Sequence, residues 1–199
     1  MYEDFHYPLF IDATKTLART PTEAHRILTH CLILTLSMFL HLLSYFEMPN
    51  LYIIAGCNGA GKTTASYTIL PEMLNCKEFV NADSIATGLS PFNYEGVAFE
   101  AGRIMLQRIH QLTSEKVDFA FETTLAAKNY VQLIKIVKIF DYEITLLYFW
   151  LNSPELAKQR VASRVKKGVH NITDEIIERR YYRGIFNLFN LYISACTTG

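Results

Sequence analysis

Residues 51–64 read LYIIAGCNGAGKTT, an apolar run followed by a glycine-rich segment that ends in a lysine and two threonines. Within it, residues 56–63 match the pattern G-x-x-x-x-G-K-[ST] in full. The glycines of this pattern let a loop turn back with its backbone N–H groups pointing inward, where they bind phosphates at the start of a helix. We therefore predict a strand over residues 51–55, a phosphate-binding loop, and a helix over residues 61–70.

The residues of this loop have separate expected roles. Lys62 is expected to reach the β- and γ-phosphates of a nucleotide, and Thr63 is expected to offer its hydroxyl to Mg²⁺. The remaining contacts to the phosphates are assigned to Gly56, Asn58, Gly59, Ala60, Gly61 and Thr64. The expected cofactors are therefore ATP or GTP together with Mg²⁺. A glycine turn beside a surface lysine is the alternative.

The rest of the chain after Met48 alternates between two kinds of apolar pattern. Short apolar runs bounded by turn residues predict further strands over residues 78–81, 117–122 and 144–151. Helical spacing predicts helices over residues 95–112, 128–140, 154–166 and 173–191. This alternation predicts an α/β fold, a three-layer P-loop NTPase with a mainly parallel sheet. In such sheets ligands bind beyond the carboxyl ends of the strands.

Two carboxylates follow predicted strands and are therefore expected at the edge that holds the phosphate loop. Asp83 comes just after the second strand and Glu122 ends the third. In phosphoryl transfer one carboxylate accepts the proton of the acceptor hydroxyl while another orients Mg²⁺ and its water. We assign Asp83 as the candidate base and Glu122 as the residue that orients metal or substrate. A helix N-cap is the alternative for Asp83, and a structural role is the alternative for Glu122.

A basic segment follows between residues 158 and 183, with eight Lys or Arg residues against three acidic ones. Arg160 and Arg164 are four residues apart and share a helix face. In a kinase such a segment closes over the γ-phosphate and supplies arginine to the transition state. The alternative is a solvated helical hairpin. No interleaving of aromatic and basic residues gives a specific signal for nucleic-acid binding.

Several spaced motifs together resemble a known family. They are LYIIAGCNGAGKTT, FVNADSIATGLSP (79–91), AGR (101–103), FAFETTL (119–125) and RVASRVKKGVHNITDEIIERRYY (160–182). In this order they resemble the zeta-toxin-like P-loop kinases, in particular their small predicted-ATPase branch. The resemblance extends from Met48 to about Tyr192.

The resemblance implies a nucleotide-kinase-like fold and a small-molecule phosphate acceptor. For characterised zeta toxins that acceptor is a UDP-linked amino sugar, and an antitoxin protein is the partner. By motif, Asp83 matches the catalytic aspartate of the family, while Glu122 and Thr124 resemble a substrate-binding strand end. Glu100 lies in the helix that carries a substrate-contacting glutamate in zeta toxins, although the spacing from there to Glu122 is longer here.

Residues 1–47 have a different character from the rest. Residues 27–46 contain no Asp, Glu, Lys or Arg and are long enough to span a bilayer. Basic residues precede this segment, so a membrane helix would place the following chain outside the cytosol, away from the nucleotide it is expected to bind. Three interpretations are open: translated sequence upstream of a true start at Met48, a membrane or interfacial helix, or an additional packing helix.

The expected domains are an apolar extension over residues 1–47 and a kinase-like domain over residues 48–199. The last residues, after Tyr192, suggest a kinase-like domain that is shortened at its C-terminus and lacks an edge strand. The leading hypothesis is a Mg²⁺-dependent kinase. The alternative is a nucleotide-binding protein that has lost productive transfer or has a regulatory role.

Composition and charge limit the other classes. The chain has 199 residues, 19 Lys or Arg against 19 Asp or Glu, and 50% apolar residues, which is typical of a globular domain. The zero net charge argues against binding of nucleic acid by bulk electrostatics. The four cysteines lack the spacing of a zinc site or a disulfide framework, so we expect a reducing, cytoplasmic location.

Overall fold

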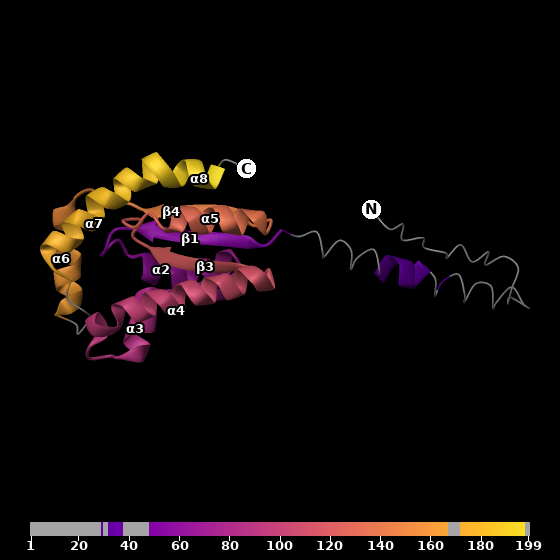
Figure 1. Cartoon of the computed structure of the whole chain (residues 1–199), viewed down its shortest axis with the longest axis horizontal. Coiled ribbons are helices and arrows are strands. Elements are labelled where there is room, and N and C mark those ends of the chain that lie inside the picture. The colour runs from indigo at the N-terminus through magenta and orange to yellow at the C-terminus, as the bar shows by residue number, and fades with distance from the viewer. Residues whose placement is uncertain (1–28, 30–31, 38–47, 167–171, 198–199) are drawn as a thin grey trace, which may run out of the picture. The chain divides into compact units, whose positions relative to one another are not determined.

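Four strands form a single parallel sheet in the computed structural model (Figure 1). Their bounds are Asn50–Gly56 (β1), Glu78–Val80 (β2), Phe119–Thr123 (β3) and Glu143–Phe149 (β4). The spatial order is β2-β3-β1-β4, and each neighbouring pair is parallel. The predicted α/β fold with a parallel sheet is therefore confirmed. The structure describes residues 29, 32–37, 48–166 and 172–197.

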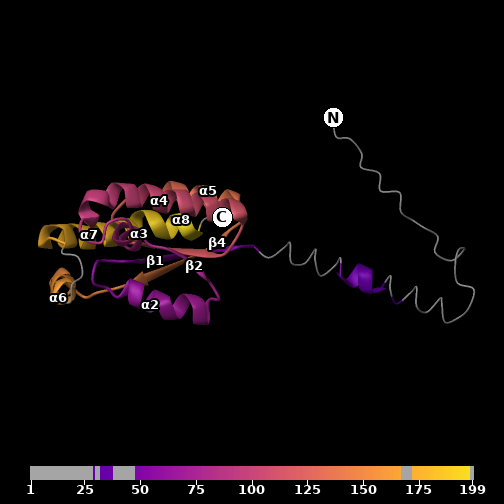
Figure 2. The ribbon, with the colours of Figure 1, turned by 90° about the horizontal axis from the view of Figure 1, so that it is seen from below.

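The central strand β1 is buried on both faces, and its apolar side chains alternate between the two sides of the sheet. Leu51, Ile53 and Ala55 belong to a core shared with α4 (Tyr94–Glu115) and α5 (Tyr130–Ile139). Tyr52 and Ile54 face the other way and pack with Leu70, which follows α2 (Lys62–Thr68). Figure 2 shows α2 on one side of the sheet and α4, α5 and α8 (Ile193–Thr197) on the other. The arrangement has the three predicted layers.

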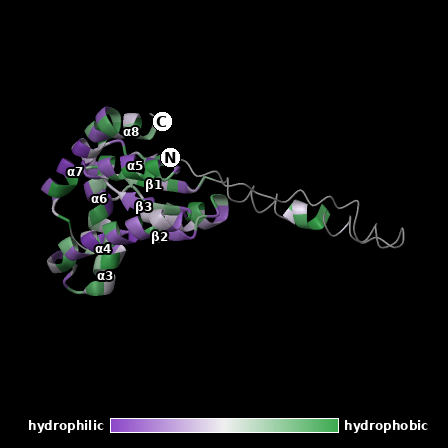
Figure 3. Cartoon of the chain, turned by 45° about the vertical axis from the view of Figure 1, so that its right-hand side comes forward, coloured by the Kyte–Doolittle hydropathy of each residue, from purple (hydrophilic) through white to green (hydrophobic). Residues whose placement is uncertain are grey.

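The helices follow the predicted ranges with shifts at their ends. The first predicted helix begins at Lys62 as α2 and continues in π-helical geometry over Ile69–Met73 (η1). The last two are α6 (Pro154–Val165) and α7 (Asp174–Asn187), and α7 continues as a π-helical segment, Leu188–Tyr192 (η2), into α8. The amphipathic character that predicted them is visible in Figure 3, where α4 carries both hydrophilic and hydrophobic residues.

One helix, α3 (Ala82–Leu89), lies where the sequence pattern predicted neither a helix nor a strand. Its N-cap is Asn81, whose side-chain oxygen accepts hydrogen bonds from the backbone N–H groups of Asp83 and Ser84. Asp83 is therefore not the cap, and that alternative for its role is wrong. A helix this short gains most of its stability from tertiary packing, here against α4, so its apolar pattern alone is weak.

The predicted N-terminal extension falls almost entirely outside the described residues. Within the predicted apolar segment 27–46, the structure describes Thr29 and residues 32–37, which are helical. Leu32, Ile33, Leu34 and Leu36 are exposed there. None of the helices built from described residues is both long enough and apolar enough to cross a membrane. Internal contacts group Met48–Gly199 into one compact unit. The division into two domains stays a prediction.

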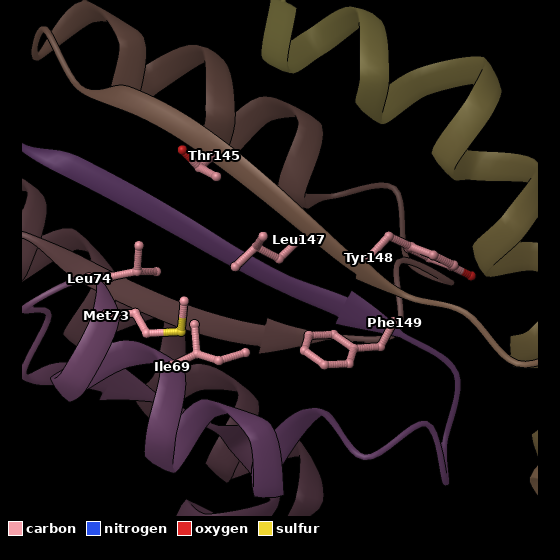
Figure 4. A pocket seen from close by; sticks show the side chains of 7 residues that line it. All are labelled: Ile69, Met73, Leu74, Thr145, Leu147, Tyr148 and Phe149. Atoms are coloured by element: carbon pink, nitrogen blue, oxygen red, sulfur yellow. The ribbon is translucent and has the colours of Figure 1, made fainter.

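An apolar groove lies between η1 and the edge strand β4 (Figure 4). The side chains that line it are Ile69, Met73, Leu74, Thr145, Leu147, Tyr148 and Phe149. In Figure 4 Leu147 and Phe149 point toward η1, whereas Tyr148 points to the other side of the strand. None of the residues predicted to bind phosphate, metal or acceptor lines this groove. It is therefore separate from the candidate site.

Candidate active site

The phosphate loop follows β1 at the carboxyl edge of the sheet. Gly56, Gly59 and Gly61 have φ angles of 141°, 80° and 89°, which turn the loop back on itself. At Gly59 a Cβ atom would also lie 2.9 Å from the backbone oxygen of Ala157 in α6. Glycine is required there both by its backbone conformation and by the close approach of α6. The loop ends at Gly61, the N-cap of α2.

Lys62 and Thr63 both contact Glu122, which is the strongest link between the loop and β3. The ammonium group of Lys62 lies 3.3 Å from Oε1 of Glu122 and donates a hydrogen bond to the backbone oxygen of Cys57 at 3.1 Å. The hydroxyl of Thr63 donates to Oε2 of the same carboxylate at 2.7 Å. The side chains of Lys62 and Glu122 are only 6% and 11% exposed, so this ion pair is shielded from solvent.

Strand pairing explains why these residues meet. Ile54 of β1 is paired in register with Glu122 of β3, so the carboxylate lies beside the strand that leads into the loop. Asn81, at the end of the neighbouring strand β2, donates from Nδ2 to Oε2 of Glu122 at 2.8 Å. Three strand ends therefore contribute to one cluster at the carboxyl edge of the sheet.

Asp83 comes two residues after Asn81 and is the second residue of α3. Its side chain is exposed. Its charge acts on Arg180 of α7, where it favours the protonated guanidinium. Burial is the larger influence on Arg180 and lowers its pKa, because removal from water disfavours the charged form. Asp83 and Arg180 thus belong to the same electrostatic environment although they lie on different helices.

Helices α6 and α7 cover the phosphate loop through an apolar cluster. Its buried members are Cys57, Leu151, Ala157, Val161, Ile177 and Tyr181, with Ala60 packed against them. The two helices are joined by an ion pair of 2.6 Å between Lys158 and Glu178. The Tyr181 hydroxyl donates to the backbone oxygen of Leu151 at 2.9 Å, which anchors α7 to the chain segment after β4. The parts of the basic segment that lie in α6 and α7 are therefore packed onto the loop and are more than a solvated hairpin.

The arginines of this segment lie at different distances from the loop. Arg180 donates from Nη1 to Oδ1 of Asn58 in the loop at 3.3 Å. The Cβ atom of Arg160 would be 3.2 Å from a Cβ placed on Gly59, and its charge acts on Cys57. Arg164 is exposed near the end of α6, and no contact between it and the loop is found among the described residues. The structure therefore brings Arg160 to the loop together with Arg180, which the sequence analysis did not single out.

The loop after β3 is held by α7 and η2. Asn187 donates from Nδ2 to the backbone oxygens of Leu125 and Ala126 at 2.8 and 3.3 Å, and the Tyr192 hydroxyl donates to that of Ala127. Gly184 of α7 approaches so closely that an added Cβ would lie 2.5 Å from the backbone oxygen of Thr124. The hydroxyl of Thr124 accepts from the N–H of Ala126 at 3.4 Å. Thr124 thus lies in a loop whose backbone is fixed by the helix that carries Arg180.

Glu100 is less integrated than the other predicted residues. It is exposed on α4 and forms an ion pair of 3.8 Å with Arg103 of the same helix. Among the described contacts none links its side chain to the phosphate loop or to Glu122. Its assignment to acceptor binding therefore stays a prediction that rests on the resemblance.

The thiol of Cys57 in the loop is buried. Burial raises its pKa, and the nearby charges of Lys62 and Arg160 lower it by less. This environment favours a packing role in the apolar cluster over a reactive thiolate. Cys57, Cys76 and Cys196 are all free thiols.

The donor set at the loop fits a Mg²⁺ ion bound together with a nucleotide. The Thr63 hydroxyl donates its hydrogen to Glu122, so the oxygen lone pairs are directed away from that contact and are available to a cation. Mg²⁺ in phosphoryl-transfer sites is bound by few protein oxygens together with phosphates and waters. Among the described residues there is no group of three or more His, Cys, Asp or Glu side chains that would form an all-protein cage.

The four-stranded parallel sheet, the phosphate loop after β1 and the helices on both faces define the class of P-loop kinase folds. A protein of Chloroflexus aurantiacus described as a candidate kinase has a similar structure, with a TM-score of 0.55 and 16% identity over 68% of this chain and 78% of that one. The PezAT toxin–antitoxin system of Streptococcus pneumoniae contains another, with a TM-score of 0.53 and 20% identity over 61% of this chain and 55% of that one. At these identities the likeness concerns the fold.

The family is shown by the sequence. The model of the zeta toxin family matches residues 41–185, and the chain therefore belongs to the zeta toxin family. An uncharacterized protein of Haemophilus influenzae is 29% identical over 126 residues, which is 63% of this chain and 88% of that protein. The family match begins a few residues before Met48, where the motif-based resemblance began.

Proposed function

We propose that this chain is a Mg²⁺-dependent kinase that transfers the γ-phosphate of ATP or GTP to a hydroxyl group of a small metabolite. The observation that carries the proposal is the convergence of Lys62, Thr63 and Asn81 on the Glu122 carboxylate, beside the phosphate loop. Membership of the zeta toxin family supports a UDP-linked amino sugar as the acceptor class.

In this proposal Asp83 is the general base. Its carboxylate is exposed at the start of α3 and is free of the capping contacts that Asn81 makes. The acceptor hydroxyl oxygen forms a bond to the γ-phosphorus as the bond between that phosphorus and the β–γ bridging oxygen breaks. Asp83 accepts the hydroxyl proton, and the nucleoside diphosphate leaves with the bridging oxygen.

Positive charge is supplied by the loop and by the two covering helices. In this proposal Lys62 leaves Glu122 and binds the β- and γ-phosphates; the contact of its ammonium group with the loop backbone supports this role. Arg160 and Arg180 approach the loop and balance the charge that develops on the transferred group. Arg164, one turn from Arg160, has the same role when the substrate is bound.

The residues that would hold the cation are Thr63 and Glu122. Bound there, Mg²⁺ neutralises the phosphate oxygens and orients the γ-phosphate for in-line attack. The acceptor contacts are assigned to Asp83, Glu122, Thr124 and Glu100. The phosphate contacts are assigned to Gly56, Asn58, Gly59, Ala60, Gly61 and Thr64 of the loop.

Two further parts of the proposal concern the cellular setting. An antitoxin protein is the proposed macromolecular partner, since the family is that of zeta toxins and one structural neighbour comes from a toxin–antitoxin system. The proposed location is the cytoplasm, because ATP, GTP and nucleotide sugars are made there. Neither part rests on a contact within the structure.

The test is a transfer assay on the full chain with Mg-ATP or Mg-GTP and a panel of nucleotide sugars and nucleosides. Mass spectrometry should show a product about 80 Da heavier than its acceptor, the mass that a phosphoryl group adds. Asp83→Ala should cut transfer by about a hundredfold or more while nucleotide affinity changes little. The matched control is Glu115→Ala, which removes an exposed carboxylate at the C-terminal end of α4.

Two results would count against the proposal. Equal turnover in Asp83→Ala and Glu115→Ala would remove Asp83 from its role as the base. Nucleotide binding without any product, across the whole panel, would favour the second function, a nucleotide-binding protein without productive transfer.

A further inference from the structure

The side chain of Asn81 contacts both the start of α3, where Asp83 lies, and the Glu122 carboxylate beside the phosphate loop. Its Oδ1 accepts hydrogen bonds from the N–H groups of Asp83 and Ser84 at 2.8 and 3.2 Å. Its Nδ2 donates to Oε2 of Glu122 at 2.8 Å. Asn81 is 6% exposed, so water has little access to replace either contact.

The neighbours of Asn81 fix the orientation of its amide group. A flipped amide would place its NH₂ group against two backbone N–H donors and its oxygen against a carboxylate, and both contacts would be repulsive. Aspartate could cap α3 but would bring a second negative charge to Glu122. Serine could cap the helix but has no amide donor to reach the carboxylate. Asparagine supplies the acceptor and the donor together.

We infer that Asn81 is a positioning residue for phosphoryl transfer, which holds the Glu122 carboxylate toward the phosphate loop and fixes the start of α3, with Asp83, beside it. This inference rests on the proposed function, and it assigns to Asn81 a role that acts through Glu122. Asn81 itself touches neither phosphate nor acceptor in this assignment.

This role follows from the two carboxylate oxygens of Glu122, which have different partners. Lys62 takes Oε1, whereas Thr63 and Asn81 share Oε2. Without the Asn81 donor, the carboxylate loses one of the two hydrogen bonds that hold Oε2 and can turn toward the ammonium of Lys62. A carboxylate that has turned toward the ammonium of Lys62 competes with the phosphates for that ammonium. It also no longer holds the Thr63 hydroxyl in one orientation.

The diagnostic variant is Asn81→Ser, because serine keeps an oxygen for the N-cap and lacks the donor to Glu122. It should lower kcat by about tenfold or more, and the KM for ATP should change by less than about threefold. Asn81→Asp, which has the same shape and also caps, is the second variant and should lower kcat at least as much. Ser84→Ala is the control, since it alters a side chain in the first turn of α3 but leaves the backbone N–H that Asn81 accepts in place.

The decisive experiment is a double-mutant cycle between Asn81→Ser and Glu122→Ala in the full chain, with Glu122→Gln as a second background. Phosphoryl transfer and the affinity for a fluorescent ATP analogue with Mg²⁺ are both measured, and thermal unfolding verifies that each variant is folded. If Asn81 acts through Glu122, Asn81→Ser should lower the rate of phosphoryl transfer by about tenfold in the wild-type background. In a background without the Glu122 carboxylate it should lower that rate by less than about threefold.

The inference would be overturned if Asn81→Ser lowered the transfer rate equally in both backgrounds, or did not lower it in the wild-type background. The two readouts also separate it from the proposed function. If the wild type binds Mg-nucleotide but transfers no phosphate to any acceptor, the kinase is contradicted, and the role of Asn81 in transfer is overturned with it. Transfer by the wild type together with additive effects would support the kinase and overturn the role of Asn81.

Discussion

The hydroxyl of Thr63 lies 2.7 Å from Oε2 of Glu122, although 59 positions separate the two residues in the chain. The contact exists because β1 and β3 are adjacent and parallel, with Ile54 opposite Glu122. It links the residue after the P-loop lysine to the end of the neighbouring strand. It also leaves the lone pairs of the Thr63 oxygen available to a cation, which gives the first prediction.

Replacement of Thr63 should change the response to Mg²⁺ according to whether a hydroxyl is kept. Thr63→Val removes the hydroxyl at similar volume and should raise the Mg²⁺ concentration for half-maximal nucleotide binding by about tenfold or more. Thr63→Ser keeps the hydroxyl and should stay within about threefold of the wild type. Titration with Mg²⁺ in the presence of a fluorescent ATP analogue measures both. Identical titrations for valine and serine would exclude Thr63 as a ligand.

The two members of the buried ion pair should differ in their effect on stability. Glu122→Ala leaves the ammonium of Lys62 buried with only the Cys57 oxygen as a partner, and should cost about 3 kcal/mol or more of the free energy of unfolding. Lys62→Ala leaves the carboxylate with two hydrogen-bond donors, Thr63 and Asn81, so its cost should be lower by about 1 kcal/mol or more. Urea denaturation without nucleotide measures the difference, and the reverse order would refute this account of the pair.

Two helical glycines should respond in opposite directions to alanine. In Gly184→Ala the new Cβ would meet the backbone oxygen of Thr124 at 2.5 Å, which α7 can relieve only by moving away from the loop after β3. We expect a loss of about 1–3 kcal/mol. Gly102→Ala, in α4, meets nothing within 4 Å and should gain up to about 1 kcal/mol from helix propensity. Thermal or urea unfolding of both variants is the measurement; destabilisation of similar size in both would argue against a specific contact at Gly184.

Stability should fall in alkaline solution, and Cys76 should contribute to the fall. Burial is the main cause that raises the pKa of the Cys76 thiol from 9.0 to about 11. Between those values the folded protein keeps a proton that the unfolded chain releases, so the free energy of unfolding falls as the pH rises from about 9 to about 11. Tyr142 and Tyr148, whose pKa values burial raises to about 12, act in the same direction above pH 10.

Cys76→Ala should therefore show a shallower decline than the wild type over this pH range, whatever its stability at pH 7. Urea denaturation at several pH values between 7 and 11 measures the slope for both proteins. A decline in the variant as steep as in the wild type would mean that Cys76 titrates normally in the folded state.

Much of the fold followed from local patterns. The glycine loop and the apolar runs predicted the order of strands and helices, because a buried parallel strand reads as a short apolar run and a covering helix as an amphipathic one. The missed elements were α8, which lies beyond the last predicted helix, and α3, whose eight residues depend on a cap by Asn81 and on packing against α4. The π-helical segments that continue α2 and α7 were not predicted either. A change from α-helical to π-helical hydrogen bonds over a few residues alters the spacing of apolar residues too little to be recognised in the sequence.

The candidate site was predicted in part. Lys62 and Thr63 were predicted because they end a phosphate-loop motif that follows a strand, and Glu122 because it is a carboxylate at the end of a predicted strand. Asn81 was passed over as a neighbour of Asp83, and the signal that could have found it is its place directly before a short helix, where asparagine is a preferred cap. Arg180 had no local mark to distinguish it from Arg179 and Arg183, since only packing selects the face of α7 that meets the loop.

The sequence alone determined that this chain has a phosphate loop between a strand and a helix, that parallel strands follow it, and that it belongs to the zeta toxin family. These are properties of residue type and spacing along one segment at a time. Only the tertiary structure decided which side chains meet: that β3 lies beside β1, that Asn81 and Thr63 share one oxygen of Glu122, and that α7 turns Arg180 toward Asn58. Such contacts join residues far apart in the chain, and they depend on strand order and helix rotation, which no single stretch of sequence specifies.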